Sequence, residues 1–188
     1  MTDIAAAARE IATARLILRP PTLDDAPAIQ AVFAQWEVVR YLNADNVPWP
    51  YPADGALTYL RDRVLPGLAS GESIHWTIRP RVAPDQIVGM LTLRFGDGEN
   101  RGFWLDPAHR GHGYMLEAAN AVTDLWFGEL GQKVLRVTKA VANIPSRRIS
   151  EQQGMRVIET PTLRTVGGEE PAELWEITAD EWHVRKAK

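Results

Sequence analysis

A loop with two closely spaced glycines joins a predicted strand at residues 103–105 to a predicted helix. Glycine lets the backbone approach a ligand closely because no Cβ stands in the way. The unpaired N–H groups and the positive dipole end of a helix N-terminus favour an anion, and an arginine in this loop adds a full charge. The sequence therefore predicts a phosphate site around Arg110, Gly111, His112 and Gly113, where a helix begins with Tyr114 and Met115.

The glycine pair also has a purely structural interpretation, because such pairs often serve only as turns. The strand-loop-helix context with Arg110 favours ligand binding over a turn. A dinucleotide-binding fold is excluded, because the third glycine position is Leu116 and no acidic residue ends the next predicted strand at 134–141.

Composition is that of one ordinary globular domain. The chain has 188 residues, 45% of them hydrophobic and 24% charged, so we expect a single domain over residues 1–188 in which 1–13 form a short helix or a frayed leader. A net charge of −3 gives no general attraction to nucleic acid or an anionic membrane. The chain has no cysteine, so disulfides, thiolate metal sites and a cysteine nucleophile are excluded and no metal is expected. Asp3 and the lack of a long apolar run predict a cytoplasmic protein.

The elements that position the loop follow from hydrophobic periodicity. Thr22 is expected to cap a helix that faces the core, and a second helix is expected over residues 54–68. Three strands at 73–78, 87–95 and 101–105 form an antiparallel meander. The helix after the loop ends near Gly131, and Asn143 caps another helix. Further strands are expected at 134–141, 155–159 and 174–177. This order predicts an α/β fold with helices covering a largely antiparallel sheet. The stripes expected to face the core are Ile29, Val32, Phe33 and Trp36 in the first helix and Leu57, Leu60 and Val64 in the second.

Four segments together resemble the GCN5-related N-acetyltransferases (GNAT), in the branch of the RimJ/RimL ribosomal-protein N-terminal acetyltransferases. They are residues 15–19, 102–115, 143–155 and 174–182. The resemblance implies a three-layer fold with a mostly antiparallel sheet of six to seven strands, helices on both faces and splayed central strands. It also implies acetyl-CoA as co-substrate, with its pyrophosphate on the loop and its pantetheine arm between the strands, and a monomer or homodimer.

The strand before the loop is expected to face the thioester. If the strands at 103–105 and 134–141 part, the amides of pantetheine can satisfy the freed backbone groups as a surrogate strand. We expect the N–H of Leu105 to stabilise the oxyanion, with Trp104 beside it. Two positions depart from the family pattern, because Ala108 replaces a Gln or Arg and Met115 replaces a small residue.

The proton donor for the leaving thiolate is expected from the helix at Asn143. The four tyrosines all precede this helix, so the tyrosine found there in many family members is absent. Ser146 stands in the Asn-x-x-Ser arrangement that resembles the RimJ/RimL enzymes, and we assign it the acid role. Asn143 would orient Ser146 or contact pantetheine; the alternative is a helix cap and a solvent-facing serine.

The general base has several candidates. The family places a glutamate at the position of Asn100, whereas the glutamate here is Glu99, and a shift of one residue turns a side chain to the other face of a strand unless a bulge intervenes. His75 and His109 are the alternatives, because histidine is the side-chain type that can exchange a proton near neutral pH, although His75 also suits a packed strand. No base is needed if the acceptor is an α-amine, whose pKa is about 7.7–8.0.

The acceptor is expected to be a primary amine, either a protein N-terminus or a small molecule. Trp49 and Tyr51, in a loop stiffened by prolines, either line the acceptor pocket or plug the core. Direct attack in a ternary complex is the first hypothesis for the reaction. The alternative, motivated by Ala108 and the displaced Glu99, is an acyl-CoA-binding sensor with weak activity. A longer acyl donor is a third hypothesis, motivated by the bulk of Trp104 and Met115.

Overall fold

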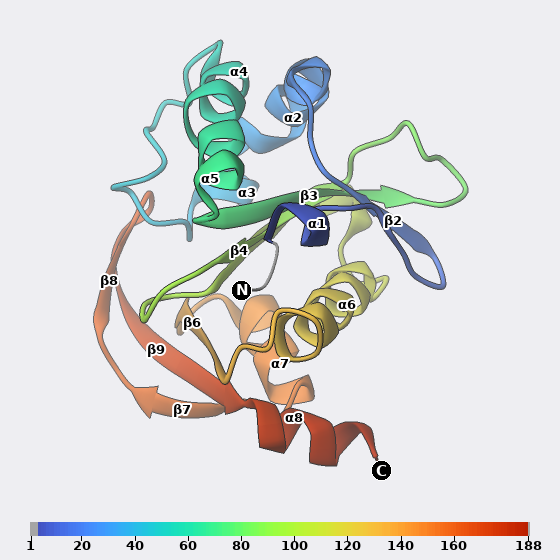
Figure 1. Cartoon of the computed structure of the whole chain (residues 1–188). Coiled ribbons are helices and arrows are strands. Elements are labelled where there is room, and N and C mark those ends of the chain that lie inside the picture. The colour runs from blue at the N-terminus through green and yellow to red at the C-terminus, as the bar shows by residue number, and fades with distance from the viewer. Residues whose placement is uncertain (1–3, 188) are drawn as a thin grey trace.

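Nine strands form two antiparallel sheets in the computed structural model, which describes residues 4–187 (Figure 1). The first sheet has the order β1-β2-β3-β4-β5, and the second has the order β6-β9-β7 with β8 paired to β9. The strands are β1 (Ile11–Ala12), β2 (Leu16–Arg19), β3 (Ser73–Pro80), β4 (Gly89–Arg94), β5 (Arg101–Leu105), β6 (Val134–Ala140), β7 (Arg156–Glu159), β8 (Thr162–Thr165) and β9 (Gly168–Thr178). The predicted α/β class is confirmed, but two sheets replace the single sheet of six to seven strands.

Helices cover both faces of the first sheet, as Figure 1 shows. On one face, α2 (Ala26–Phe33) and the continuous helix formed by α4 (Gly55–Tyr59), η2 (Leu60–Val64) and α5 (Leu65–Ser70) pack on Ile87 and Met90. On the other face, α6 (Tyr114–Phe127) packs on β2, β3 and β4. The remaining helices are α1 (Ile4–Ala7), α3 (Trp36–Val39), α7 (Ile144–Gln152) and α8 (Ala179–Lys186), with short 3-10 turns η1 (Leu23–Asp25) and η3 (Pro107–His109).

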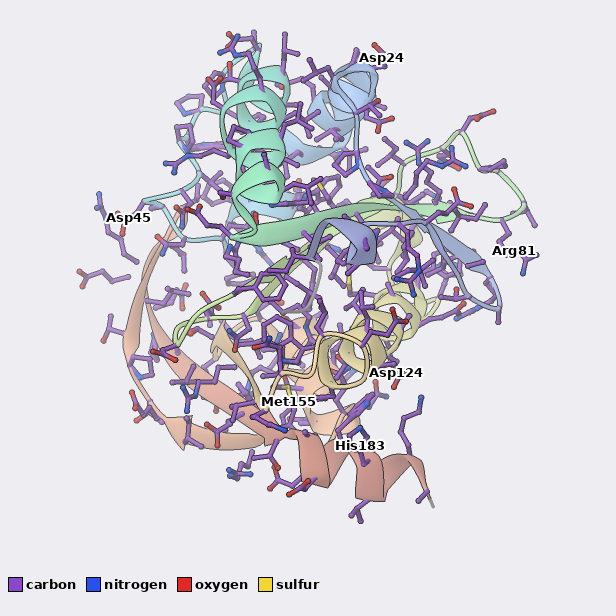
Figure 2. All side chains as sticks on the ribbon, in the orientation of Figure 1. Asp24, Asp45, Arg81, Asp124, Met155 and His183 are labelled. Carbon is purple, nitrogen blue, oxygen red and sulfur yellow. The ribbon has the colours of Figure 1, made fainter. Side chains whose placement is uncertain are left out.

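The main core lies between the first sheet and α6. Trp76 and Trp126 are its largest fully buried side chains, and the small side chains of Ala118 and Ala119 let α6 approach the sheet closely. Side chains fill this interior in Figure 2, where Met155 lies inside while Arg81 and His183 lie at the periphery. No helix among residues 4–187 is long and apolar enough to span a membrane.

Two of the predicted helices bury different residues from those expected. The first is interrupted, because α2 ends at Phe33 and Trp36 begins α3 with 40% of its surface exposed. In the second, Leu57 is 41% exposed, and the buried stripe is Ala56, Leu60 and Val64. A π-helical segment at Leu60–Val64 adds one residue to the turn, which favours spacings of four along this face.

The C-terminal region contains β8 and α8, which the sequence patterns did not predict. The expected strand at 174–177 is the end of the long β9, which pairs with β6, β7 and β8. Helix α8 then begins at Thr178, whose side chain accepts the N–H of Glu181 in a capping box. Trp182 anchors α8, because it is buried and its Nε1 donates to Asp124 Oδ1 at 2.9 Å.

Candidate active site

Strands β5 and β6 meet at one end and then part. At the closed end, Asn100 N donates to Arg136 O at 2.8 Å. Beyond that point the two strands belong to different sheets. Trp104 is paired with Met90 of β4, and Asp106 N donates to Val88 O. Because hydrogen-bonding direction alternates along a strand, the N–H of Leu105 points away from β4, toward the open side.

Two side chains occupy the gap between β5 and β6 and hold it open. Asn100 Oδ1 accepts the N–H of Arg136 at 2.9 Å, and Glu99 Oε1 accepts the N–H of Thr138 at 2.7 Å. These are two of the main-chain donors of β6 that face β5, because hydrogen-bonding direction alternates and the N–H groups of Val137 and Lys139 point toward β9. Side chains therefore replace the ladder that would otherwise join the two sheets.

The loop before α6 presents main-chain donors at a helix N-terminus. Gly111 and Gly113 have φ of +81° and +76°, in the left-handed region that glycine adopts without strain. A Cβ at Gly111 would meet no atom within 4 Å. Within residues 4–187, the main-chain N–H groups of residues 111–115 have no acceptor. Five consecutive free donors at the start of a 14-residue helix match the chemistry of a pyrophosphate.

Arg15, the residue before β2, braces this loop from 97 residues away in sequence. Its Nη1 donates to His112 O at 2.8 Å, its Nε donates to Glu117 Oε2 at 2.7 Å, and its guanidinium lies 5.1 Å from the centre of the Tyr114 ring. Burial would raise the pKa of Glu117, but hydrogen bonds from Thr13 and Arg15 outweigh it and lower the pKa. The carboxylate is thus kept charged in the first turn of α6, where the dipole favours it.

Arg110 connects the loop to the end of β5. Its Nη2 donates to Leu105 O at 3.3 Å and to Glu37 O at 2.8 Å, so the guanidinium lies between the open strand and α3. Burial and the nearby charge of Arg40 lower the pKa of Arg110. Met115, predicted as a contact, is buried and can reach a ligand only through its backbone.

Asn143 and Ser146 lie at the start of α7, as predicted. Asn143 Oδ1 accepts the N–H of Ser146 at 3.4 Å, which is the helix cap. The Ser146 hydroxyl accepts a hydrogen bond from Lys139 Nζ of β6 at 2.8 Å. The structure therefore brings Ser146 to the edge of β6, beside the gap.

A buried polar network lies under the same gap. Arg101 of β5 is 2% exposed and donates to Thr123 Oγ1 of α6 at 2.9 Å and to Gln153 Oε1 at 2.8 Å. Within residues 4–187, Arg101 Nε and Ser150 Oγ are buried without a partner. Burial lowers the pKa of Arg101 to about 10. The space between the strands and the helices is thus positively charged and suits a negatively charged or carbonyl-rich ligand.

Both candidate histidines are held by hydrogen bonds. His75 is 6% exposed, and its ring contacts Ser73 Oγ at 3.0 Å and Thr92 Oγ1 at 2.9 Å. Burial, with the charge of Arg94, lowers the pKa of His75 to about 3, so the ring is neutral at pH 7. His109, the last residue of η3, has its Nδ1 3.2 Å from Oδ2 of Asp106, which caps η3. His75 is part of the core rather than an open surface.

Aromatic side chains gather beside the end of β5. Phe33 packs edge-on against Tyr51 at 4.9 Å and Trp104 at 5.4 Å between ring centroids. Trp49 is 42% exposed and lies 5.4 Å from the Trp36 ring. Burial raises the pKa of Tyr51 to about 12, so its hydroxyl stays protonated. The sequence left two roles for these residues, lining the acceptor pocket or plugging the core. Trp49 faces solvent, so it is free for the first role. Tyr51 packs on Gly55, which matches the second.

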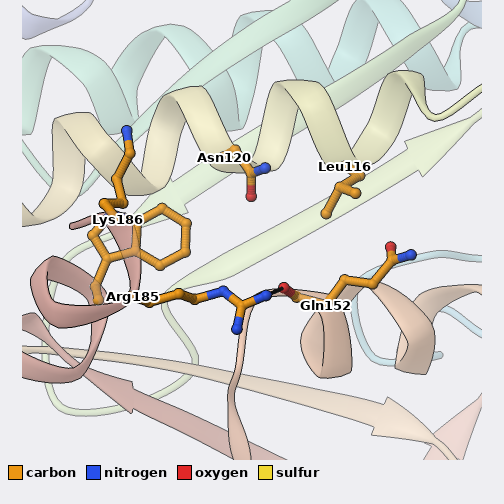
Figure 3. Close-up of a pocket in the computed structure, with 6 residues that line it drawn as sticks. Leu116, Asn120, Gln152, Arg185 and Lys186 are labelled. Atoms are coloured by element: carbon orange, nitrogen blue, oxygen red, sulfur yellow. Dashed lines mark hydrogen bonds between the residues drawn. The ribbon is translucent and has the colours of Figure 1, made fainter. Parts of the chain in front are cut away.

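Two cavities flank the site. One lies between α6, α7 and α8, and its lining residues are drawn in Figure 3. Both of its basic side chains already have partners: Arg185 donates to Gln152 O, and Lys186 forms an ion pair with Asp124. The other opens at the β5–β6 gap and is lined by Asp97, Gly98, Glu99, Arg136, Thr138, Ile158, Glu159 and Leu174. It is the cavity into which Glu99 faces.

Sequence reasoning missed Arg15, Arg101 and Lys139 as parts of this site. Arg15 contacts the loop before α6, 97 residues further along the chain. Arg101 contacts Thr123 and Gln153, 22 and 52 residues away. No local pattern indicates such contacts. Lys139 offered one signal, because a lysine at an inward position of a strand breaks the apolar alternation of Leu135 and Val137.

Comparison with solved structures shows the same fold in bacterial acetyltransferases. RimJ from Mycobacterium smegmatis in complex with CoA-disulfide has a TM-score of 0.75 at 22% identity, covering 88% of this chain and 83% of that one. A ribosomal-protein-alanine acetyltransferase from Vibrio fischeri has a TM-score of 0.77 at 15% identity, covering 92% and 98%. RimL in complex with coenzyme A has a TM-score of 0.75 at 14% identity, covering 92% and 99%.

Sequence comparison gives the family. No curated protein sequence matches the chain. The family model described as an acetyltransferase (GNAT) domain matches residues 15–156, which include the loop before α6 and the start of α7. The match covers well over half of the chain, and the protein therefore belongs to the GNAT acetyltransferase family.

Proposed function

We propose that the protein transfers an acetyl group from acetyl-CoA to a primary amine, by direct attack within a ternary complex. The observation that carries this proposal is the row of free N–H groups at residues 111–115, which continues from the open edge of β5. One continuous segment thus offers donors for the pyrophosphate and, at Leu105, a donor for the acetyl carbonyl.

The helix at Asn143 supplies the proton. Ser146 Oγ gives its proton to the sulfur as the thiolate leaves, and the buried charges of Arg101 and Lys139 stabilise the negative charge that develops there. Asn143 uses Oδ1 for the cap and has Nδ2 available for the pantetheine arm. Ala108, which replaces the Gln or Arg of the family pattern, changes only a side chain, so the loop keeps its main-chain N–H donors.

The acceptor enters from the cavity beside Glu99. Glu99 Oε1 is bound to Thr138 N, and Oε2 has no partner among residues 4–187, so Oε2 is the candidate base. Asp97, Glu99 and Glu159 make this cavity predominantly acidic, although Arg136 also lines it. An ammonium group fits such a lining better than an anion does. Together with RimJ and RimL as neighbours in fold, this favours a protein N-terminus over a small amine.

The test is turnover by the purified protein. Acetyl-CoA is mixed with a panel of peptides with free N-termini and of small amines, and CoA thiol and acetylated product are both measured. We expect equal amounts of thiol and product, with peptides preferred. Tight binding of acetyl-CoA by calorimetry without transfer to any amine would instead establish an acyl-CoA sensor.

A further inference from the structure

Lys139 of β6 is buried in the space where β6, β5 and α7 meet. Its residue surface is 5% exposed, its Nζ lies 4.6 Å from the centre of the Phe103 ring, and Nζ donates to Ser146 Oγ at 2.8 Å. Lysine is almost never fully buried unless it is paired. The reason for burying this one therefore has to be found among its contacts.

No carboxylate pairs with Lys139 within residues 4–187. Its cross-strand neighbour on β9 is Glu173, but that carboxylate is bound by Arg147 of α7 at 2.8 and 3.0 Å. The other charged groups facing Lys139 are Arg101 of β5 and Glu99 before β5. The hydrogen bond to Ser146 is thus the one directed polar contact of the ammonium group in the described chain.

The surroundings also make Lys139 a stronger acid than an ordinary lysine. Burial, together with the charge of Arg101, lowers the pKa of Lys139 well below 10.5, while Glu99 opposes the shift. An unperturbed lysine has a pKa of about 10.4 and a thiol about 8.5, so transfer of a proton from lysine to a thiolate is ordinarily uphill. A lowered pKa of Lys139 reduces or removes this unfavourable free-energy difference.

We propose that Lys139 is a positioning residue that holds the Ser146 hydroxyl toward the leaving sulfur and returns a proton to it during acetyl transfer. This inference rests on the proposed function. The new C–N bond forms as the C–S bond breaks, and the electron pair of the C–S bond goes to sulfur. Ser146 gives its proton to sulfur, and Lys139 Nζ gives one to Ser146 Oγ. The amine loses one proton to Glu99 or water, and Lys139 regains one from solvent.

The experiment compares Lys139→Met, Ser146→Ala and the double variant with a matched control, Lys133→Met, whose side chain is exposed at the residue before β6. The expected result is a fall in kcat of about 100-fold for Lys139→Met and for Ser146→Ala, and no further fall in the double variant. Lys133→Met keeps full activity. Acetyl-CoA affinity stays within a few-fold in all variants, because neither side chain binds the phosphates.

The pH dependence of kcat distinguishes proton transfer by Lys139 from a purely structural role, because a structural role would leave the shape of this profile unchanged. Wild-type kcat is expected to fall on the alkaline side as Lys139 loses its proton, and this limb is expected to be absent in Lys139→Met. The inference is overturned if Lys139→Met retains kcat and the alkaline limb, or if the two substitutions act multiplicatively. It is also overturned if acetyl-CoA alone acetylates Ser146, detected by intact mass, since Lys139 would then activate a nucleophile. Absence of wild-type turnover would instead reject the proposed function.

Discussion

Glu99 Oε1 accepts the main-chain N–H of Thr138 at 2.7 Å, across the gap between the two sheets. This contact satisfies a donor that a continuous sheet would have paired with β5. Together with Asn100, it pairs two main-chain donors of β6 where the strands part. The same carboxylate lines the cavity at the gap, which we propose as the entry of the acceptor.

Glu99→Gln separates these two roles, because the amide oxygen still accepts the Thr138 N–H but the base is lost. We expect kcat at pH 7 to fall by about 100-fold, with the deficit shrinking as rising pH deprotonates the amine without help. Steady-state rates between pH 6 and 9 measure this, with the exposed Glu72→Gln as control. Unchanged rates in Glu99→Gln would show that Glu99 only holds the strands apart.

Gly111→Ala tests the phosphate loop against Gly131→Ala. Both glycines have positive φ, +81° and +62°, and neither has an atom within 4 Å of an added Cβ. Forcing alanine into this region costs about 1–2 kcal/mol in each case. We expect similar losses in Tm, but a loss of acetyl-CoA affinity of about tenfold or more only in Gly111→Ala, measured by calorimetry. Equal affinities in the two variants would place the pyrophosphate elsewhere.

Arg15→Met removes the brace between the start of β2 and the loop. The Arg15 side chain is half exposed, so solvent weakens each of its hydrogen bonds, but Glu117 is largely shielded and several contacts are lost together. We therefore expect acetyl-CoA Kd to rise by about three- to tenfold as the loop loosens. The control is Arg19→Met, which breaks only an exposed pair with Glu10, with side chains 40% and 49% exposed. If both variants bind acetyl-CoA as the wild type does, the loop needs no support from Arg15.

His75 predicts a loss of stability in acid. Its pKa is about 3 in the folded protein and about 6.5 when unfolded. The unfolded state therefore binds more protons between these values, and stability falls as pH drops from about 6.5 toward 3, by up to about 1.4 kcal/mol per pH unit. Urea unfolding at pH 7 and 4.5 measures the slope, which His75→Gln should flatten and the exposed His183→Gln should not. Equal slopes in all three proteins would mean that His75 is not the group responsible.

The sequence predicted the parts of the site that local patterns encode. Strand β5, the glycine loop and the cap at Asn143 each lie within a few residues, so turn chemistry and periodicity were sufficient. The contacts of Arg15 with His112 and of Glu99 with Thr138 join segments far apart in the chain, and no local pattern specifies them. Lys139 and Ser146 are only seven residues apart, but their contact depends on how the turn between β6 and α7 folds back. Helix α8 is a different case, because the capping box of Thr178 and Glu181 is a local pattern that marks the start of this helix in the sequence.

The exposed Trp36 and the long β9 show where periodicity failed. A run of apolar residues at helical spacing does not show that a turn interrupts it, as happens between Phe33 and Trp36. Strand β9 contains Pro171 and a run of glutamates that argue against a strand, but it is stabilised by pairing with three neighbours. Tertiary pairing outweighed local propensity there.

A crystal structure of the wild-type protein with acetyl-CoA would show directly whether this loop and gap hold the donor. We expect pyrophosphate oxygens within hydrogen-bond distance of the N–H groups at residues 111–115 and pantetheine between β5 and β6. The acetyl oxygen is expected at Leu105 N, with sulfur beside Ser146 Oγ. Acetyl-CoA bound instead in the cavity between α6, α7 and α8, with Leu105 N and the loop donors unengaged, would contradict this expectation.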